Sequence, residues 1–227
     1  MKKRKMFLFT RSFPYGYSES FLENEVPYLS RNFNLTIIPD NLDSENLREL
    51  PESVKLDTTW AQFGKIKRTI RGLSSCSLSI KDLVKEFIKV PKNLGAIRQY
   101  FSWFTFANSQ KTWFKIKYSN EIDEGDILYS YWLNFSAISI GLVKSNFNDL
   151  IVISRAHRYD LYEERIDNDN NYIPFRNLTL QNLNKIFVVS KHGVNYLKSK
   201  YPEYSNKIQL SRLGVRVAIK LNPNNTG

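Results

Sequence analysis

Short apolar runs alternate with helical stretches along the chain. Runs rich in β-branched and aromatic residues predict buried strands at 6–10, 35–39, 54–56, 127–130, 150–153, 185–189 and 207–210. Between them, apolar residues at helical spacing predict helices at 19–31, 79–91, from 94 onward, 111–117, 131–145 and 190–200. Strands that alternate with helices in this way are typical of a doubly wound sheet. We therefore expect an α/β, Rossmann-like fold with a mainly parallel sheet.

The loop after the first strand, RSFPYGYSES, has the residues of a tight turn. Pro14 and Gly16 mark the turn, and either Ser18 or Ser20 can cap the helix that follows. Glycine lets another group approach the backbone closely, and N–H groups near a helix N-terminus attract anions. The loop lacks a GxGxxG fingerprint, so as a nucleotide motif it is weak.

A dense group of ionisable side chains follows the apolar run 150–153. It includes Arg155, His157 and Asp160, and it begins where the strand leaves the sheet. In open α/β sheets, ligands bind beyond the carboxyl ends of the strands. The alternative is a solvated loop whose charges pair with one another. Because His157 is one of only two histidines and follows a strand end, it favours a functional site.

Positive charge is concentrated between residues 65 and 117. The chain has a formal net charge of +11, and this stretch carries twelve Lys and Arg against two acidic residues, a net charge of +10. Such a field implies an anionic partner, membrane lipid or nucleic acid, and the alternative is a solvating face. No RRM, KH or zinc-finger signature supports nucleic acid.

Basic helices that carry aromatic residues suit a membrane interface, where the rings lie at head-group depth and lysine reaches phosphate. The other interpretation is that these aromatic residues pack the helices onto the sheet. The predicted membrane-binding residues are Lys81, Lys85, Lys89, Lys92, Trp103 and Trp113.

Composition limits the class of protein. The 227 residues are 42% hydrophobic, enough for one large domain, and the single cysteine excludes an internal disulfide and fits a reducing compartment. The apolar stretch 6–9 is too short for a signal peptide, and no segment approaches the roughly 20 apolar residues of a spanning helix. We expect a cytoplasmic protein, peripheral on the inner face of the plasma membrane.

Four segments, in order, resemble parts of one family. They are FPYGYSESFLENEVPYLS, SYWLNFSA, ISRAHRYDLYEER and FVVSKHGVNYLKSKYPEYSNKIQLSRLGV. Together they are similar to the N-terminal domain of family-four glycosyltransferases of the GT-B fold, in the subgroup that makes exopolysaccharide and lipopolysaccharide. The resemblance covers nearly the whole chain.

The resemblance implies a retaining transferase that moves a sugar from a nucleotide-sugar to a growing, lipid-linked glycan without a metal or other cofactor. His157 matches the histidine that projects into the cleft beside the donor sugar. The loop of Gly16, Tyr17 and Ser18 matches the turn under the diphosphate. The remaining candidate substrate-binding residues are Arg155, Asp160 and Ser190, and capping a helix is the stronger interpretation of Ser190.

The resemblance also sets the expected domains. Residues 1–215 correspond to the N-terminal domain, with 65–117 as an inserted basic helical region and 216–227 as a truncated interdomain linker. In the family, a second Rossmann-like domain binds the nucleotide, and this chain stops at NPNNTG, where that domain begins. We therefore expect an acceptor-binding half that is inactive alone. The alternatives are a non-catalytic, peripheral membrane-binding module and a complete one-domain enzyme, for which no nucleophile–base pair is found.

Overall fold

The computed structural model describes residues 3–42, 47–76, 78–147, 149–164 and 171–214. A seven-stranded sheet forms its centre, every neighbouring pair is parallel, and the strand order is β3-β2-β1-β4-β5-β6-β7. The fold is therefore α/β and Rossmann-like, as predicted. The strands are β1 (Lys5–Thr10), β2 (Asn34–Pro39), β3 (Lys55–Leu56), β4 (Ile127–Ser130), β5 (Ile151–Ala156), β6 (Lys185–Val188) and β7 (Ile208–Leu210).

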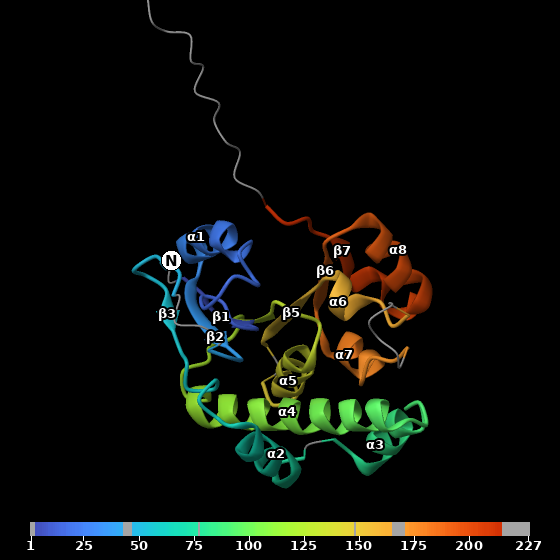
Figure 1. Ribbon diagram of the computed structural model, residues 1–227. Coiled ribbons are helices and arrows are strands. Elements are labelled where there is room, and N and C mark those ends of the chain that lie inside the picture. Colours follow the sequence, from blue (N-terminus) through green and yellow to red (C-terminus); the bar gives the residue numbers. More distant parts are fainter. Residues whose placement is uncertain (1–2, 43–46, 77, 148, 165–170, 215–227) are drawn as a thin grey trace, which may run out of the picture.

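Helices form layers beside the sheet (Figure 1). The long helix α4 crosses below α5, and α2 and α3 lie on the far side of α4. None of the described helices is both long and apolar enough to cross a membrane. The helices are α1 (Leu22–Asn32), α2 (Lys65–Ser74), α3 (Ile80–Phe87), α4 (Leu94–Tyr118), α5 (Phe135–Lys144), α6 (Arg158–Leu161), α7 (Arg176–Asn182) and α8 (Lys191–Lys200), with a 3-10 helix at Pro202–Lys207.

Alternating side chains of the strands fill two cores, one on each face of the sheet. Met6 and Leu8 of β1 belong to the core on the α1 side. Phe7 and Phe9 point to the opposite face, where the ring of Phe7 meets that of Phe114 of α4 edge to face at 5.1 Å. The period of two along β1 therefore attaches α1 to one face and the basic helical region to the other.

The basic helical region differs from the prediction in two respects. Residues 94–118 form one continuous helix rather than separate pieces, and residues 65–74, within the predicted helical region but not assigned a helix of their own, form α2. Trp113 is only 4% exposed and lies 5.8 Å from the Trp60 ring, so the prediction that it contacts lipid is wrong. The side chain of a residue this deep in the core cannot reach a membrane.

Helix α2 packs on α4 at very short range because Gly72 has no side chain. A Cβ atom at this position would lie 1.9 Å from the backbone oxygen of Thr105. On the same side of α2, Arg68 turns inward and its guanidinium lies 4.4 Å from the Trp60 ring centroid. The close contact thus fixes which side of α2 faces the rest of the protein.

Candidate functional site

The loop after β1 is organised by the buried carboxylate of Glu19. Its oxygens accept hydrogen bonds from the backbone N–H groups of Arg11, Ser12 and Phe13 at 3.0, 2.8 and 2.7 Å. Trp132 Nε1 donates a fourth at 2.5 Å. The predicted caps at Ser18 and Ser20 are not used, since α1 begins at Leu22 without a side-chain cap. The N–H groups of this loop, which the sequence analysis considered as donors to a bound anion, thus donate to the carboxylate of Glu19.

The predicted turn residues lie in this loop. Gly16 has a φ of 67°, a left-handed conformation that favours glycine, and its carbonyl accepts a hydrogen bond from Arg48 Nε at 2.7 Å. Tyr17 is exposed, and Ser18 Oγ lies 3.0 Å from Ser12 Oγ. These residues shape the rim of the first loop, and none of the predicted three lines the cavity described next.

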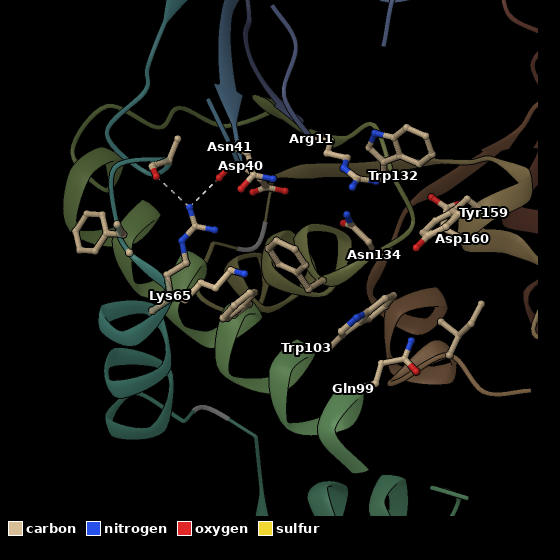
Figure 2. Close-up of a pocket in the computed structure, with 17 residues that line it drawn as sticks. Arg11, Asp40, Asn41, Lys65, Gln99, Trp103, Trp132, Asn134, Tyr159 and Asp160 are labelled. Atoms are coloured by element: carbon tan, nitrogen blue, oxygen red, sulfur yellow. Dashed lines mark hydrogen bonds between the residues drawn. The ribbon is translucent and has the colours of Figure 1, made fainter. Parts of the chain in front are cut away.

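A cavity of about 520 Å³ lies at the carboxyl ends of β1, β2, β4 and β5. Figure 2 shows Arg11, Asp40, Trp132 and Asp160 around its upper side, at the strand ends. Helices α2 and α4 close the cavity from the other side with Lys65, Gln99 and Trp103. Arg68 of α2 and Phe106 of α4 also line it. The cavity spans the neighbouring strands β1 and β4, where the strand order reverses and open α/β sheets bind ligands.

Trp132 is held in the cavity wall by the ends of two strands. Its carbonyl accepts hydrogen bonds from Ser130 Oγ at 2.6 Å and Ser154 Oγ at 3.2 Å, and these serines are paired in register across β4 and β5. Asn134 follows it and caps α5 through the Ser136 backbone N–H. Trp103 of α4 lies across the cavity. It was predicted to contact a membrane, but in the structure it lines the cavity.

Asp40 is the buried acid on one side of the cavity. Its Oδ1 accepts hydrogen bonds from Trp60 Nε1 at 2.8 Å and Gln110 Nε2 at 2.9 Å, and Ser136 Oγ lies 3.3 Å from Oδ2. Burial raises the pKa of Asp40 to about 7, although these hydrogen bonds and the positive charge of Arg68 act in the opposite direction.

Asp160 is the buried acid on the other side. Its carboxylate accepts hydrogen bonds from the backbone N–H groups of Leu133 at 2.5 Å and His157 at 2.6 Å, and burial raises its pKa to about 7. It thereby ties the loop after β4 to the loop after β5. Both carboxylates of the cavity are engaged by donors from the protein itself.

His157 lies beside the cavity, behind one of its walls. Its ring is 4.5 Å from the ring of Trp132 and stacks on Phe21 at 5.5 Å, and the residue is 7% exposed. Its Nε2 has no hydrogen-bond partner among the described residues. Burial, assisted by the nearby charge of Arg155, lowers the pKa of His157 to about 4. At neutral pH the imidazole is therefore uncharged, which leaves hydrogen bonding as the form of contact it offers a ligand.

Arg155 and Ser190 make structural contacts within the protein. Arg155 belongs to β5 rather than to a loop, its Nε donates to Tyr129 Oη at 3.0 Å, and its Nη1 lies 2.9 Å from the carboxylate of Glu25. Ser190 caps α8 by accepting a hydrogen bond from the Gly193 N–H at 3.0 Å, which confirms the stronger interpretation. Neither residue lines the cavity.

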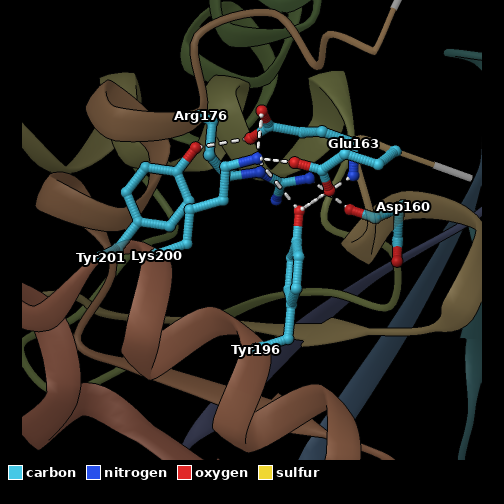
Figure 3. A network of polar contacts seen from close by, with 7 residues as sticks. Asp160, Glu163, Arg176, Tyr196, Lys200 and Tyr201 are labelled. Atoms are coloured by element: carbon cyan, nitrogen blue, oxygen red, sulfur yellow. Dashed lines mark hydrogen bonds and ion pairs between the residues drawn. The ribbon is translucent and has the colours of Figure 1, made fainter.

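A network of polar contacts holds the segment after Asp160 on α8 (Figure 3). Lys200 Nζ lies 2.9 Å from Glu163 Oε2, Tyr201 Oη donates to the other oxygen of Glu163 at 2.5 Å, and Arg176 donates to the Asp160 carbonyl. Figure 3 shows these side chains converging, with Lys200 from α8, Tyr201 from directly after α8, Arg176 from α7 and Glu163 from the segment after α6. The network fixes the backbone that carries Asp160. The predicted linker 216–227 lies outside the described residues.

Several residues of the site were not among the sequence-based candidates. Arg11, Asp40, Lys65, Arg68 and Trp132 come from four separate stretches, and only folding brings them together. The available signal was the position of Arg11 and Asp40 directly after predicted strands and of Trp132 at a predicted strand-to-helix turn. In the part of the chain that the structure describes, no group of three His, Cys, Asp or Glu residues could hold a metal ion.

Comparison with known proteins supports the fold. No family model matches the chain, and no curated protein matches it in sequence. Among solved structures, it is similar to the N-terminal domain of trehalose-6-phosphate phosphatase from Candida albicans, with a TM-score of 0.55 and 12% identity. The match covers 94% of this chain and 49% of that one, so this chain spans about half the length of its structural neighbour. At this identity the likeness shows a shared Rossmann-like α/β fold.

The lowered pKa of His157 predicts a specific pH dependence of stability. Between about pH 6.5 and pH 4 the unfolded chain binds a proton at His157 that the folded chain does not, so this residue lowers stability as the pH falls. Asp40 and Asp160, whose pKa values are raised, act in the opposite direction over the same range. In His157→Phe, the free energy of unfolding relative to the wild type should therefore rise by about 2 kcal/mol between pH 6.5 and 5.

Urea denaturation at a series of pH values measures this difference. His192→Phe is the matched control, since it replaces the other histidine, which is exposed on α8. A constant difference between His157→Phe and the wild type would contradict the lowered pKa.

Proposed function

We propose that this chain is the acceptor-binding half of a retaining glycosyltransferase, which moves a sugar from a nucleotide-sugar to a lipid-linked surface polysaccharide intermediate. The observation that carries the proposal is that two of the segments that resemble such enzymes line the same cavity. SYWLNFSA contributes Trp132 and Asn134, and ISRAHRYDLYEER contributes Tyr159 and Asp160.

The composition of the cavity suits a carbohydrate. Trp103, Trp132 and Phe106 offer apolar ring faces, on which the C–H face of a sugar can pack. Asn41, Asn134 and Gln99 provide amide groups that donate and accept hydrogen bonds, as sugar hydroxyls require. A volume of about 520 Å³ lies within the usual range for small-molecule sites and exceeds the needs of one sugar ring.

The donor's nucleotide has no comparable place in the first loop. Backbone N–H groups in such a loop and at a helix N-terminus often bind phosphate. Here the N–H groups of Arg11, Ser12 and Phe13 donate hydrogen bonds to Glu19 instead. In the proposed enzyme the nucleotide is bound by a second Rossmann-like domain. His157 and Gly16 are then proposed to lie at the interface between donor and acceptor, with His157 as a neutral hydrogen-bonding group.

We expect residues 1–227 to bind short oligosaccharides from surface polysaccharides and to bind no UDP- or GDP-sugar. Saturation-transfer NMR measures the first and calorimetry the second. Trp103→Ala should weaken oligosaccharide binding about tenfold by removing a ring face. Trp113→Phe, in the core behind the cavity, is the control and should bind like the wild type. Micromolar affinity for a nucleotide-sugar, or no binding of any oligosaccharide, would contradict the proposal.

An anionic membrane surface is the proposed location of this activity, on the inner face of the plasma membrane. The supporting observation is that α2 directs its apolar side away from the protein. Ile66, Ile70 and Leu73 are 77%, 63% and 58% exposed, while Arg68 and Gly72 on the opposite side are buried. An apolar stripe this exposed, on a helix that also carries Lys67 and Arg71, has the composition of a helix that lies in a lipid interface.

Helix α3 extends this surface. Val84, Phe87 and Ile88 are exposed, and α3 and α4 enclose an apolar groove of about 270 Å³ whose lining includes Phe101 and Phe104. Lys81, Lys85 and Lys92 are exposed around it. The two acids of this stretch are engaged: Asp82 with the Ser79 cap, and Glu86 with Lys89 at 2.7 Å. The uncompensated lysines complement anionic head groups. The same surface supports the second candidate function, a non-catalytic membrane-binding module.

A further inference from the structure

We propose that the cavity takes a saccharide unit that carries an anionic group, either the carboxylate of a uronic acid or a phosphate. This inference rests on the proposed function, because it names the chemistry of the acceptor that the same site would bind. The observation behind it is the set of cations that face the cavity, Arg11, Lys65 and Arg68.

The cations come from two sides of the cavity. Arg11 follows β1, and Lys65 lies across the cavity in the first turn of α2 (Figure 2). Arg68 belongs to the same turn. Arg11 and Lys65 are exposed and form no ion pair with any described residue. Two free charges and a third, buried charge around one cavity make a site whose electrostatic potential favours an anion.

Arg68 is an unusual residue for a cavity wall because it is only 5% exposed. Its Nη2 donates to the carbonyl oxygens of Asp40 at 2.8 Å and Trp60 at 3.1 Å, while its Nε has no partner among the described residues. Carbonyl groups thus hold a buried guanidinium in the cavity wall, where the nearby acid Asp40 interacts with its charge.

Among the described residues, the acids of the cavity form no ion pair with these cations. Asp40 accepts hydrogen bonds from Trp60, Gln110 and Ser136, and Asp160 accepts them from two backbone N–H groups. Both carboxyl groups are fully buried, and burial favours their protonated, uncharged form. The groups that remain to face a ligand are thus cationic, amide and aromatic.

Cations and aromatic rings together define the class of ligand. An inorganic anion would leave the ring faces of Trp103 and Trp132 unused, and a neutral sugar would leave the cations uncompensated. An acidic sugar satisfies both, since its ring packs on the indoles while its carboxylate or phosphate reaches Arg11 or Lys65. The cavity has room for such a unit and a neighbouring sugar.

Calorimetric or NMR titration of residues 1–227 with four probes tests the inference. The probes are a disaccharide that ends in glucuronic acid, the methyl ester of the same disaccharide, glucose 1-phosphate and inorganic phosphate. At about 0.1 M salt, we expect the acidic disaccharide or the sugar phosphate to bind at least tenfold more tightly than the ester. Raising the salt to about 0.5 M should reduce this difference by screening.

Two variants link the effect to the proposed cations. Arg11→Gln and Lys65→Gln should each lower affinity for the preferred acidic probe about tenfold, a larger loss than for the ester. Lys67→Gln is the matched control, because Lys67 lies on α2 outside the cavity lining and should bind like the wild type. Thermal unfolding confirms that each variant is folded, which is expected since all three side chains are exposed.

The outcomes separate the possibilities. Preference for the uronate or for the sugar phosphate supports the inference and identifies the anion. Equal affinity for the acid and its ester overturns it while leaving the proposed acceptor site intact, whereas failure of every saccharide to bind overturns both. Inorganic phosphate that binds as tightly as glucose 1-phosphate would also overturn it, since the site would then recognise an anion without a sugar.

Discussion

Replacing Glu19 by alanine is expected to lower the free energy of unfolding by on the order of 4 kcal/mol. The substitution would leave the N–H groups of Arg11, Ser12 and Phe13 without their acceptor and would remove the partner of Trp132 Nε1. Hydrogen bonds to a charged group contribute roughly 1.5–3 kcal/mol each, and water that enters the loop would recover part of the loss. This one carboxylate therefore stabilises the loop after β1 and one wall of the cavity.

Urea denaturation of Glu19→Ala measures the effect, and Glu23→Ala is the matched control. Glu23 lies four residues further along and pairs with Arg48 at the surface, so its replacement should cost about 1 kcal/mol or less. Glu19→Gln should give an intermediate loss, because an amide keeps one acceptor oxygen but adds donors near the N–H groups. A loss for Glu19→Ala no larger than that of the control would show that the loop does not depend on this carboxylate.

Vesicle binding should fall by a hundredfold or more when the apolar stripe of α2 becomes polar. We expect the wild type to sediment with vesicles that contain anionic lipid, and Ile66→Gln, Ile70→Gln and Leu73→Gln together to abolish sedimentation. Burying an aliphatic side chain contributes about 1.5–3 kcal/mol. Even if each of the three side chains is only partly buried in lipid, their loss together is therefore expected to abolish binding. All three are exposed, so the fold should survive, and the control Tyr28→Gln, on α1, should bind like the wild type.

The basic residues around the stripe should contribute through charge. Lys81→Gln, Lys85→Gln and Lys92→Gln together should weaken binding by on the order of a hundredfold, at about 1 kcal/mol for each lysine near anionic lipid. A control with Lys3, Lys191 and Lys198 replaced by glutamine removes the same charge elsewhere. Lys89 is left intact because it pairs with the buried Glu86. Equal binding by the two triple variants, or no binding by the wild type at low salt, would exclude a membrane role for this surface.

The strands could be predicted from the sequence because the pattern is local. Each strand is a short apolar segment between turn residues. Each helix that packs on the sheet has an apolar face that its own residues define. Ser79 and Ser190 were also predictable as caps, since a cap depends on the next three residues only. Ser20 failed as a cap because Glu19, a stronger acceptor, draws the loop into a different conformation.

The cavity could be located only roughly, at the strand end before His157. Its composition depends on the packing of α2 against α4, which Gly72 permits, and this contact joins residues more than thirty positions apart. Helical periodicity identifies an apolar face but not whether that face is buried, so the outward stripe of α2 could not be recognised. His157 itself lies behind Trp132 rather than in the cavity, because three aromatic side chains enclose it.

Helix α2 lies between the cavity and the exposed apolar stripe, so its thickness sets the distance between them. Lys65 and Arg68 line the cavity, and Ile66, Ile70 and Leu73 emerge on the other side. A helix with its side chains is about 10 Å across, so a stripe resting on lipid would hold the cavity about that far above the head groups. Only the first sugars of a lipid-linked chain lie at that height. The position of one helix would thereby select short, membrane-proximal acceptors over the distal ends of long polymers.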